Sequence, residues 1–290
     1  MHHSIENDRV KVTVDDHGAE LTGLYDKKND RELVWCADPK FWKRHAPILF
    51  PNVGKHNDGR YRTDGKTYHI GQHGFARDRD FQLVDVGDKS IRYRLVSDEQ
   101  TKESYPYDFM LDVTHELQDD GVKVVWDVTN TGDRAMYFTI GAHPAFNLPG
   151  SGKKEDFQIC LPGNEALTVK SLNPETGTAL SDTTEIPLEN SCLPLSDKLF
   201  EQDALVMDDS QISVAELQTK NGDPVIKVTT ENFPNYGIWS VDQAPFVCLE
   251  PWCGRCDDFG FDGELKDKKG INKLAPGEKF HKSFCITVPE

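Results

Sequence analysis

Hydrophobic and polar residues alternate with a period of two along most of the chain. Val10 to Val14 reads Val-Lys-Val-Thr-Val, which is typical of a half-buried strand. The other segments with a strand-like pattern are Phe81 to Val86, Ile91 to Val96, Met110 to Leu117, Val122 to Val128, Ala135 to Ile140, Ile212 to Gln218, Val225 to Thr230, Gly237 to Val241, Phe246 to Glu250 and Lys279 to Val288. No window has the apolar spacing of an amphipathic helix of three turns. The pattern predicts an all-β protein.

Short turn sequences between these segments predict hairpins. Asp64-Gly65, Asp120-Gly121 and Asn221-Gly222 are dipeptides typical of tight hairpin turns. Near the start of the chain, we expect Glu32 to Cys36 to return as the hairpin partner of the strand that follows Gly18.

The region from Gly150 to about Asp209 has a weaker pattern. Pro, Ser, Asp and Glu are frequent in it, so we expect long loops and short strands there. No stretch has the composition of a linker. Hairpin-linked strands over residues 1–290 therefore predict a single domain, built as one large antiparallel β-sandwich.

Composition and charge narrow the possible partners. The chain has 290 residues, of which 37% are hydrophobic and 28% charged, as in an ordinary globular protein. Its formal net charge of −16 argues against nucleic acid or an anionic membrane as a partner. No apolar run reaches the roughly 20 residues of a membrane span, and the first residues lack a secretion signal. We expect a cytoplasmic protein that is a monomer or a homodimer.

The cysteine pattern predicts free thiols. The seven cysteines are odd in number and have no regular spacing, as expected in a reducing compartment. Cys253 and Cys256 form a Cys-x-x-Cys pair, but a zinc ion would need two further ligands at a similar spacing. We therefore expect no metal at that pair.

One region is basic within this acidic chain. Between Lys43 and Arg79, eight basic residues and three acidic residues give a net charge of +5. Such a region fits a phosphorylated or carboxylated substrate, and it also fits scattered surface charge.

Three residues at or just beyond the ends of predicted strands are candidates for catalysis: His73, His143 and Glu250. Glu250 follows an apolar run and precedes Pro-Trp, so partial burial would raise its pKa and suit it to act as a base near neutral pH. One interpretation is an acid and a base that flank a sugar. The other is a zinc or iron site made by the two histidines and the glutamate. The sequence lacks the short His-x-His string of many β-barrel metal sites, which favours the first interpretation.

A series of sequence strings carries a resemblance to a known family. They are Gly18-Ala-Glu-Leu, Leu33-Val-Trp, Arg44-His-Ala-Pro-Ile-Leu-Phe-Pro, Gln72-His-Gly-Phe-Ala-Arg, Gly141-Ala-His-Pro-Ala-Phe-Asn, Gln202-Asp-Ala-Leu, Tyr236-Gly-Ile-Trp-Ser, Cys248-Leu-Glu-Pro-Trp and Leu274-Ala-Pro-Gly-Glu. In this order they resemble the galactose mutarotase (aldose 1-epimerase) superfamily, and its LacX-like branch in particular. The resemblance implies the large β-sandwich of that family, a sugar or sugar phosphate as ligand, and no cofactor.

The resemblance also implies residue roles. Glu250 would be the general base and His143 the general acid that open and close the sugar ring. His73 would form a hydrogen bond to the sugar near its ring oxygen, and Arg44 would contact sugar hydroxyls. Asp203, in its Asp-Ala-Leu context, corresponds to the substrate-binding aspartate of the family.

The identity of the sugar stays open at this point. Galactose-specific members have a longer His-Gly-Gly string where this chain has His73-Gly-Phe-Ala-Arg77, which adds an arginine. Arg44, Lys55 and Arg77 together would suit the phosphate of a hexose 6-phosphate. Trp239 and Trp252 are candidates for walls against the apolar face of a sugar, or for core residues. The main alternative function is a carbohydrate-binding β-sandwich without catalysis.

Overall fold

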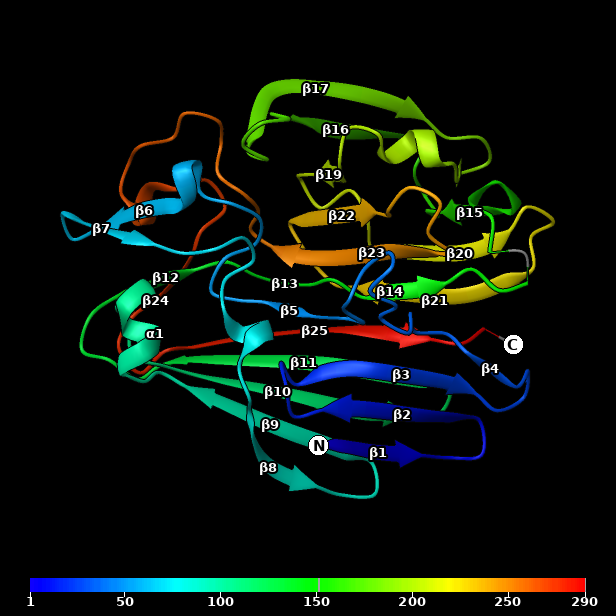
Figure 1. Cartoon of the computed structure of the whole chain (residues 1–290), viewed down its shortest axis with the longest axis horizontal. Coiled ribbons are helices and arrows are strands. Elements are labelled where there is room, and N and C mark those ends of the chain that lie inside the picture. The colour runs from blue at the N-terminus through cyan, green and yellow to red at the C-terminus, as the bar shows by residue number, and fades with distance from the viewer. Residues whose placement is uncertain (151, 290) are drawn as a thin grey trace.

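The computed structural model describes residues 1–150 and 152–289, and its paired strands are antiparallel. Within these residues two large sheets have nine and eight strands, and a third sheet has four (Figure 1). In spatial order, the nine-stranded sheet contains β18 (Cys192–Pro194), β15 (Phe157–Cys160), β20 (Val214–Thr219), β21 (Pro224–Thr230), β25 (Lys279–Thr287), β11 (Gly121–Asn130), β10 (Phe109–Gln118), β9 (Ser90–Val96) and β8 (Gln82–Val86).

The eight-stranded sheet forms the second large layer. In spatial order it contains β17 (Ala179–Pro187), β16 (Ala166–Leu172), β19 (Leu205–Met207), β22 (Asn235–Trp239), β23 (Phe246–Cys253), β13 (Ile140–Ala142) and β5 (Ile48–Leu49), with β14 (Ala145–Asn147) also paired to β23. The remaining elements are β1 (His2–Glu6), β2 (Val10–Asp15), β3 (Glu20–Asp26) and β4 (Arg31–Glu32) in the four-stranded sheet, the pairs β6 (Arg60–Thr63) with β7 (Lys66–His69) and β12 (Met136–Phe138) with β24 (Asn272–Leu274), and the helix α1 (Glu99–Ser104).

One continuous apolar core joins the sheets. It contains Leu217 and Ile226 of the nine-stranded sheet, Ile238 and Leu249 of the eight-stranded sheet, and Val12 of the four-stranded sheet. Burial of apolar side chains between layers is the main stabilising contribution in such a sandwich. The prediction of an all-β antiparallel sandwich is therefore confirmed. No helix among the described residues is both long enough and apolar enough to cross a membrane.

Strand β23 is buried on both of its faces and carries a candidate catalytic residue. Val247 and Leu249 point into the main core, whereas Cys248 and Trp252 belong to two smaller apolar clusters. Successive side chains of a strand point to opposite faces. Glu250 therefore shares the face of Cys248 and Trp252, and its carboxyl group points away from the sandwich core.

The predicted hairpins are confirmed, but two other predictions are wrong. Turns at Asp64-Gly65, Asp120-Gly121 and Asn221-Gly222 connect β6 to β7, β10 to β11 and β20 to β21. Between Gly150 and Asp209 we expected only short strands, yet β16 and β17 form a hairpin with strands of seven and nine residues. Most side chains of β17 are exposed, which removes the apolar alternation that would have marked it.

The expected strand from Glu32 to Cys36 stops after its first residue. Only Arg31 and Glu32 pair with β3. One carboxylate oxygen of Glu32 accepts hydrogen bonds from the backbone N–H groups of Leu24, Leu33 and Val34, at 2.7, 3.0 and 3.0 Å. The side chain thus occupies the N–H groups of Leu24 and Val34, while the N–H of Leu33 also donates to the backbone oxygen of Leu24 at 3.0 Å, and the regular strand pairing ends there.

The expectation of free thiols is wrong for two of the seven cysteines. Cys160 and Cys192 form a disulfide between β15 and β18. They lie directly opposite each other in the antiparallel register of these strands. This register depends on strand pairing across 32 residues of sequence, so the spacing of the cysteines gave no sign of it.

Candidate active site

The predicted site residues line one hollow on the outer face of the eight-stranded sheet. Its volume is about 520 Å³. The predicted residues that line it are Arg44, Lys55, His73, Arg77, His143, Asp203, Trp239, Glu250 and Trp252. The structure thus brings together residues that are separated by up to 208 positions in the sequence, from Arg44 to Trp252.

Glu250 and His143 face each other inside this hollow. Glu250 lies in the middle of β23 and is 1% exposed, and His143 follows β13 and is 7% exposed. Glu250 Oε2 lies 3.3 Å from His143 Nδ1. The orientation does not form a hydrogen bond, so both carboxylate oxygens and Nδ1 are buried without a hydrogen-bond partner. Buried polar atoms without hydrogen-bond partners lower the stability of the folded protein, and they occur preferentially at functional sites.

Burial shifts the protonation of this pair in opposite directions. It raises the pKa of Glu250 well above its usual value, and the negative charge of Asp203 raises this pKa further. Burial lowers the pKa of His143 to about 3, and the positive charges of Arg77 and Arg44 lower it further. Both shifts favour the uncharged forms, so the proton of the pair lies on Glu250 and His143 is neutral.

His73 is held in a fixed orientation beside this pair. Its backbone has a φ of 67°, and the next residue, Gly74, has a φ of 68°. The backbone N–H of Gly54 donates to His73 Nδ1 at 3.0 Å. Burial, together with the nearby His143 and Arg77, lowers the pKa of His73, so the ring is neutral and Nε2 carries its proton. Nε2 lies 3.1 Å from the side-chain amide of Gln72, so His73 can donate a hydrogen bond from Nε2 to a ligand that displaces this amide.

The three predicted cations differ in their surroundings. Arg44 pairs with Asp78 at 2.8 Å, and Arg77 donates to the backbone oxygen of Gln72 at 2.8 Å. Burial and the neighbouring Arg44 lower the pKa of Arg77 to about 10. The side chain of Lys55 lies against Gly177, and no ion pair within residues 1–150 and 152–289 involves its ammonium group. Of the three predicted cations, Lys55 is thus the one that no carboxylate or backbone oxygen among the described residues engages.

Asp203 lies at the rim of the hollow, in the loop before β19. Its backbone has a φ of 82°, and its Oδ1 accepts a hydrogen bond from the N–H of Ala204 at 2.7 Å. The residue is exposed, so the second carboxylate oxygen can reach a ligand.

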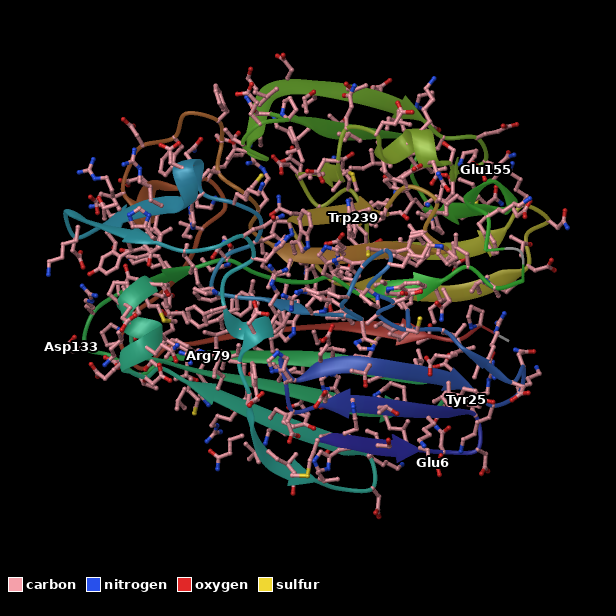
Figure 2. The ribbon with its side chains drawn as sticks, in the orientation of Figure 1. Glu6, Tyr25, Arg79, Asp133, Glu155 and Trp239 are labelled. Carbon is pink, nitrogen blue, oxygen red and sulfur yellow. A yellow bond between two sulfur atoms is a disulfide. The ribbon has the colours of Figure 1, made fainter. Side chains whose placement is uncertain are left out.

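Aromatic side chains form the walls, and one of them was missed by the sequence analysis. Trp239 at the end of β22, labelled in Figure 2, contacts His143 edge-on with ring centres 5.4 Å apart. Trp42 stacks on His143, with ring centres 4.7 Å apart and planes at 29°. Trp42 is two residues before Arg44, but nothing in its sequence context indicates that it contacts a histidine a hundred positions away.

Two glycines make room for Trp252 at the base of the hollow. A Cβ atom on Gly141 would lie 2.4 Å from Trp252 Cδ1, and one on Gly237 would lie 2.4 Å from Trp252 Cζ2. The indole therefore fits only because β13 and β22 each lack a side chain at these positions. Trp252 Nε1 donates to the backbone oxygen of Ala142 at 3.2 Å, which fixes the ring further.

We expect Gly237→Ala to destabilise the protein because the new methyl group would overlap the ring of Trp252. Overpacking of this kind costs about 1–3 kcal/mol. The free energy of unfolding in urea is the measurement. Gly87→Ala is the control, because its nearest neighbouring atom lies 3.9 Å away, and it should change stability by less than about 0.5 kcal/mol. Equal stability of the two variants would contradict the steric argument.

The alternative of a zinc or iron site made by His73, His143 and Glu250 can be tested against the potential metal ligands that lie close together in the structure. Among the described residues, the set of potential ligands consists of His143, Cys248 and Glu250, whose ligand atoms lie within 4.8 Å of one another. His73 is not part of this set. Burial raises the pKa of the Cys248 thiol, which makes the thiolate that zinc or iron binds harder to form. This donor set fits a metal ion poorly.

Comparison with known proteins identifies the family. The model of the aldose 1-epimerase family matches residues 1–267. The chromosomal LacX protein of Lactococcus lactis subsp. lactis is 32% identical to this chain over 294 residues, which cover 98% of each protein. The chain belongs to the aldose 1-epimerase family. The family predicted from the sequence strings is therefore confirmed.

Solved structures of similar proteins agree with this assignment. A galactose mutarotase related enzyme from Lactobacillus acidophilus is 36% identical, with a TM-score of 0.93, and the match covers 100% of this chain and 98% of that one. A galactose mutarotase-like protein from Lactobacillus casei is 32% identical, with a TM-score of 0.91 over all of both chains. The fold of this aldose 1-epimerase family member is thus that of its structurally known relatives.

Proposed function

We propose that the protein is an aldose 1-epimerase, which interconverts the α and β anomers of a reducing sugar. The observation that carries this proposal is the buried pair of Glu250 and His143, two proton-transfer groups 3.3 Å apart that have no hydrogen-bond partner and face a sugar-sized hollow. The match to the aldose 1-epimerase family supports the same reaction.

The proposed reaction moves one proton in each direction. The proton of the pair first moves from Glu250 to His143, across their 3.3 Å separation. Glu250 then removes the proton of the C1 hydroxyl while His143 protonates the ring oxygen, so the C1 to ring-oxygen bond breaks and an aldehyde forms. Rotation about the bond from C1 to C2 presents the other face of the aldehyde. Ring closure then returns both protons, with the two groups in exchanged roles. Because the pair keeps one proton in total, no net charge develops in the buried hollow.

The other residues would hold the sugar in position. His73 donates from Nε2 near the ring oxygen, Asp203 accepts from hydroxyl groups, and Trp239 packs against an apolar sugar face. Lys55, Arg44 and Arg77 line the same hollow, which favours an aldose phosphate as a second candidate substrate.

Polarimetry of freshly dissolved single anomers tests this proposal. α-Glucose, α-galactose and a hexose 6-phosphate should each be compared with and without protein. Faster mutarotation of at least one sugar supports the epimerase. Binding of a sugar with no acceleration of any would instead support a carbohydrate-binding protein without catalysis. Stoichiometric zinc or iron in the purified protein, with activity lost on chelation, would support the metal alternative.

We expect the pH dependence of kcat/KM to reflect the single proton of the pair. His143 would bind a second proton only as the pH falls through its lowered pKa of about 3. Glu250 would lose the proton of the pair as the pH rises through its raised pKa. Between pH 4.5 and 6.5, the usual pKa values of these groups, kcat/KM should change less than about twofold once the uncatalysed rate is subtracted. An acid limb centred near 6.5 would contradict this description of the pair.

A further inference from the structure

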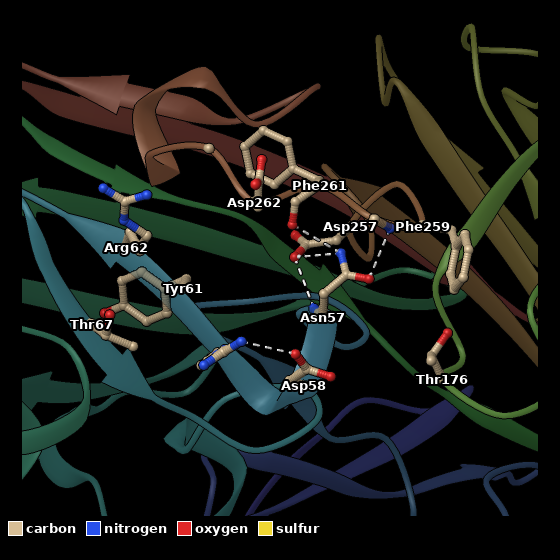
Figure 3. A pocket seen from close by; sticks show the side chains of 13 residues that line it. Asn57, Asp58, Tyr61, Arg62, Thr67, Thr176, Asp257, Phe259, Phe261 and Asp262 are labelled. Carbon is tan, nitrogen blue, oxygen red and sulfur yellow. Dashed lines mark hydrogen bonds and ion pairs between the residues drawn. The ribbon is translucent and has the colours of Figure 1, made fainter.

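A second hollow has a volume of about 470 Å³, and Figure 3 shows the side chains that line it. Three aromatic residues, Tyr61, Phe259 and Phe261, line it together with groups that can form hydrogen bonds. The polar lining residues are Asn57, Asp58, Arg60, Arg62, Thr67, Thr176, Asp257 and Asp262. None of these residues takes part in the proposed anomer exchange.

A groove connects the second hollow to the catalytic hollow. The groove has a volume of about 310 Å³. It shares Lys55 and Gln72 with the catalytic hollow, and Asp58 and Thr176 with the second hollow. Thr176 lines the second hollow and its chain neighbour Gly177 lines the catalytic one. A ligand in the catalytic hollow can therefore extend along the groove into the second hollow.

The loop that carries Phe259 is fixed by hydrogen bonds, while its ring is exposed. Asn57 Nδ2 donates to the backbone oxygens of Asp258 and Phe261 at 2.9 and 3.2 Å. The N–H of Phe259 donates to the backbone oxygen of Ala179 at 2.7 Å. Phe259 as a whole residue is nevertheless 54% exposed. A fixed backbone that presents an exposed aromatic ring provides a stacking surface that loses little entropy on binding.

The cations that line the second hollow are already paired, which disfavours an anionic ligand. Arg60 pairs with Asp58 at 3.1 Å and Arg62 with Glu264 at 3.6 Å. The buried Asp257 accepts from the ammonium of Lys268 at 2.7 Å. A phosphate would find no unpaired cation among the described lining residues. A sugar unit suits the site better, because its C–H faces stack on aromatic rings and its hydroxyls pair with amide, hydroxyl and carboxylate groups.

We propose that the second hollow binds a glycosyl unit linked to the aldose in the catalytic hollow. The substrate is then a reducing disaccharide or a longer saccharide, whose reducing unit undergoes anomer exchange at Glu250 and His143. The glycosidic bond lies in the groove and stays intact, and the second sugar stacks on Phe259. This proposal rests on the proposed epimerase function for its substrate, but its binding component can be tested separately.

Steady-state polarimetry with two disaccharides provides the test. α-Lactose and β-maltose both have glucose at the reducing end, so each is compared with glucose of the same anomer. We expect the disaccharides to have a KM about tenfold below that of glucose, as one good stacking contact would give. Phe259→Ala should abolish this difference and leave kcat/KM for glucose within about twofold. Val96→Ala is the matched control, because Val96 is 52% exposed and lies in neither hollow nor in the groove.

The outcomes separate the two proposals. Equal KM values for disaccharide and monosaccharide in the unchanged protein, or an equal effect of Phe259→Ala on both, would overturn the second sugar site. If no sugar is turned over, the epimerase proposal fails, and calorimetric titration with lactose, maltose and glucose then decides the second site. Disaccharide binding about tenfold tighter than glucose, lost in Phe259→Ala, would support the site, and equal binding would overturn it.

Discussion

Glu250→Gln should reduce kcat for anomer exchange by about 10²- to 10⁴-fold, the usual contribution of a positioned acid or base. The substitution keeps the shape of the side chain but removes its ability to exchange a proton. Its effect on stability should be absent or favourable, because the carboxyl group is 1% exposed and neither oxygen has a hydrogen-bond partner. Polarimetry of the purified variant, together with its free energy of unfolding, measures both effects.

Glu185→Gln is the matched control for this substitution. Glu185 is exposed on β17, far along the sheet from β23, so its variant should retain full activity. If Glu250→Gln kept more than about a tenth of the activity, proton transfer by Glu250 would be refuted. If the variant unfolded under the assay conditions, the account of the unpaired carboxyl group would be wrong.

His143→Gln should also reduce kcat by about 10²- to 10⁴-fold, and the double variant with Glu250→Gln should be no slower than the slower single variant. The reason is that the two groups share one proton, so the loss of either group disables both directions of transfer. The measurement is single-anomer polarimetry of both single variants and the double variant. Multiplicative losses would show that the two residues act independently, which contradicts a shared proton.

The stability of His143→Gln gives an independent check. The histidine ring stacks on Trp42 at 4.7 Å, so its loss should lower the free energy of unfolding by about 0.5–1.5 kcal/mol. His281→Gln is the surface control, since the side chain of His281 is 63% exposed and it lies on β25, outside the hollow. The His281→Gln variant should match the activity of the unchanged protein.

The sequence indicated candidate site residues where a residue type stands in a distinctive local sequence. His143 lies between a strand and a proline, and Glu250 between an apolar run and Pro-Trp, so both were found from the sequence and both line the hollow. Trp42 and Cys248 were missed as neighbours of this pair. Their contacts depend on which strands are adjacent and on the face that each side chain occupies, and neither property is encoded in the few residues around them.

The sequence by itself determined the type of structure and the family. Alternating hydrophobicity and the turn dipeptides are local signals, so they specify strands and hairpins such as β10 with β11 without knowledge of the rest of the chain. Only the tertiary structure decided the pairing of distant strands. That pairing places Cys160 opposite Cys192, allows Trp252 to fit between two glycines, and brings Glu250 within 3.3 Å of His143. The protonation of this pair follows from the same packing, because the shifts of both pKa values come first from burial, which a linear sequence does not contain.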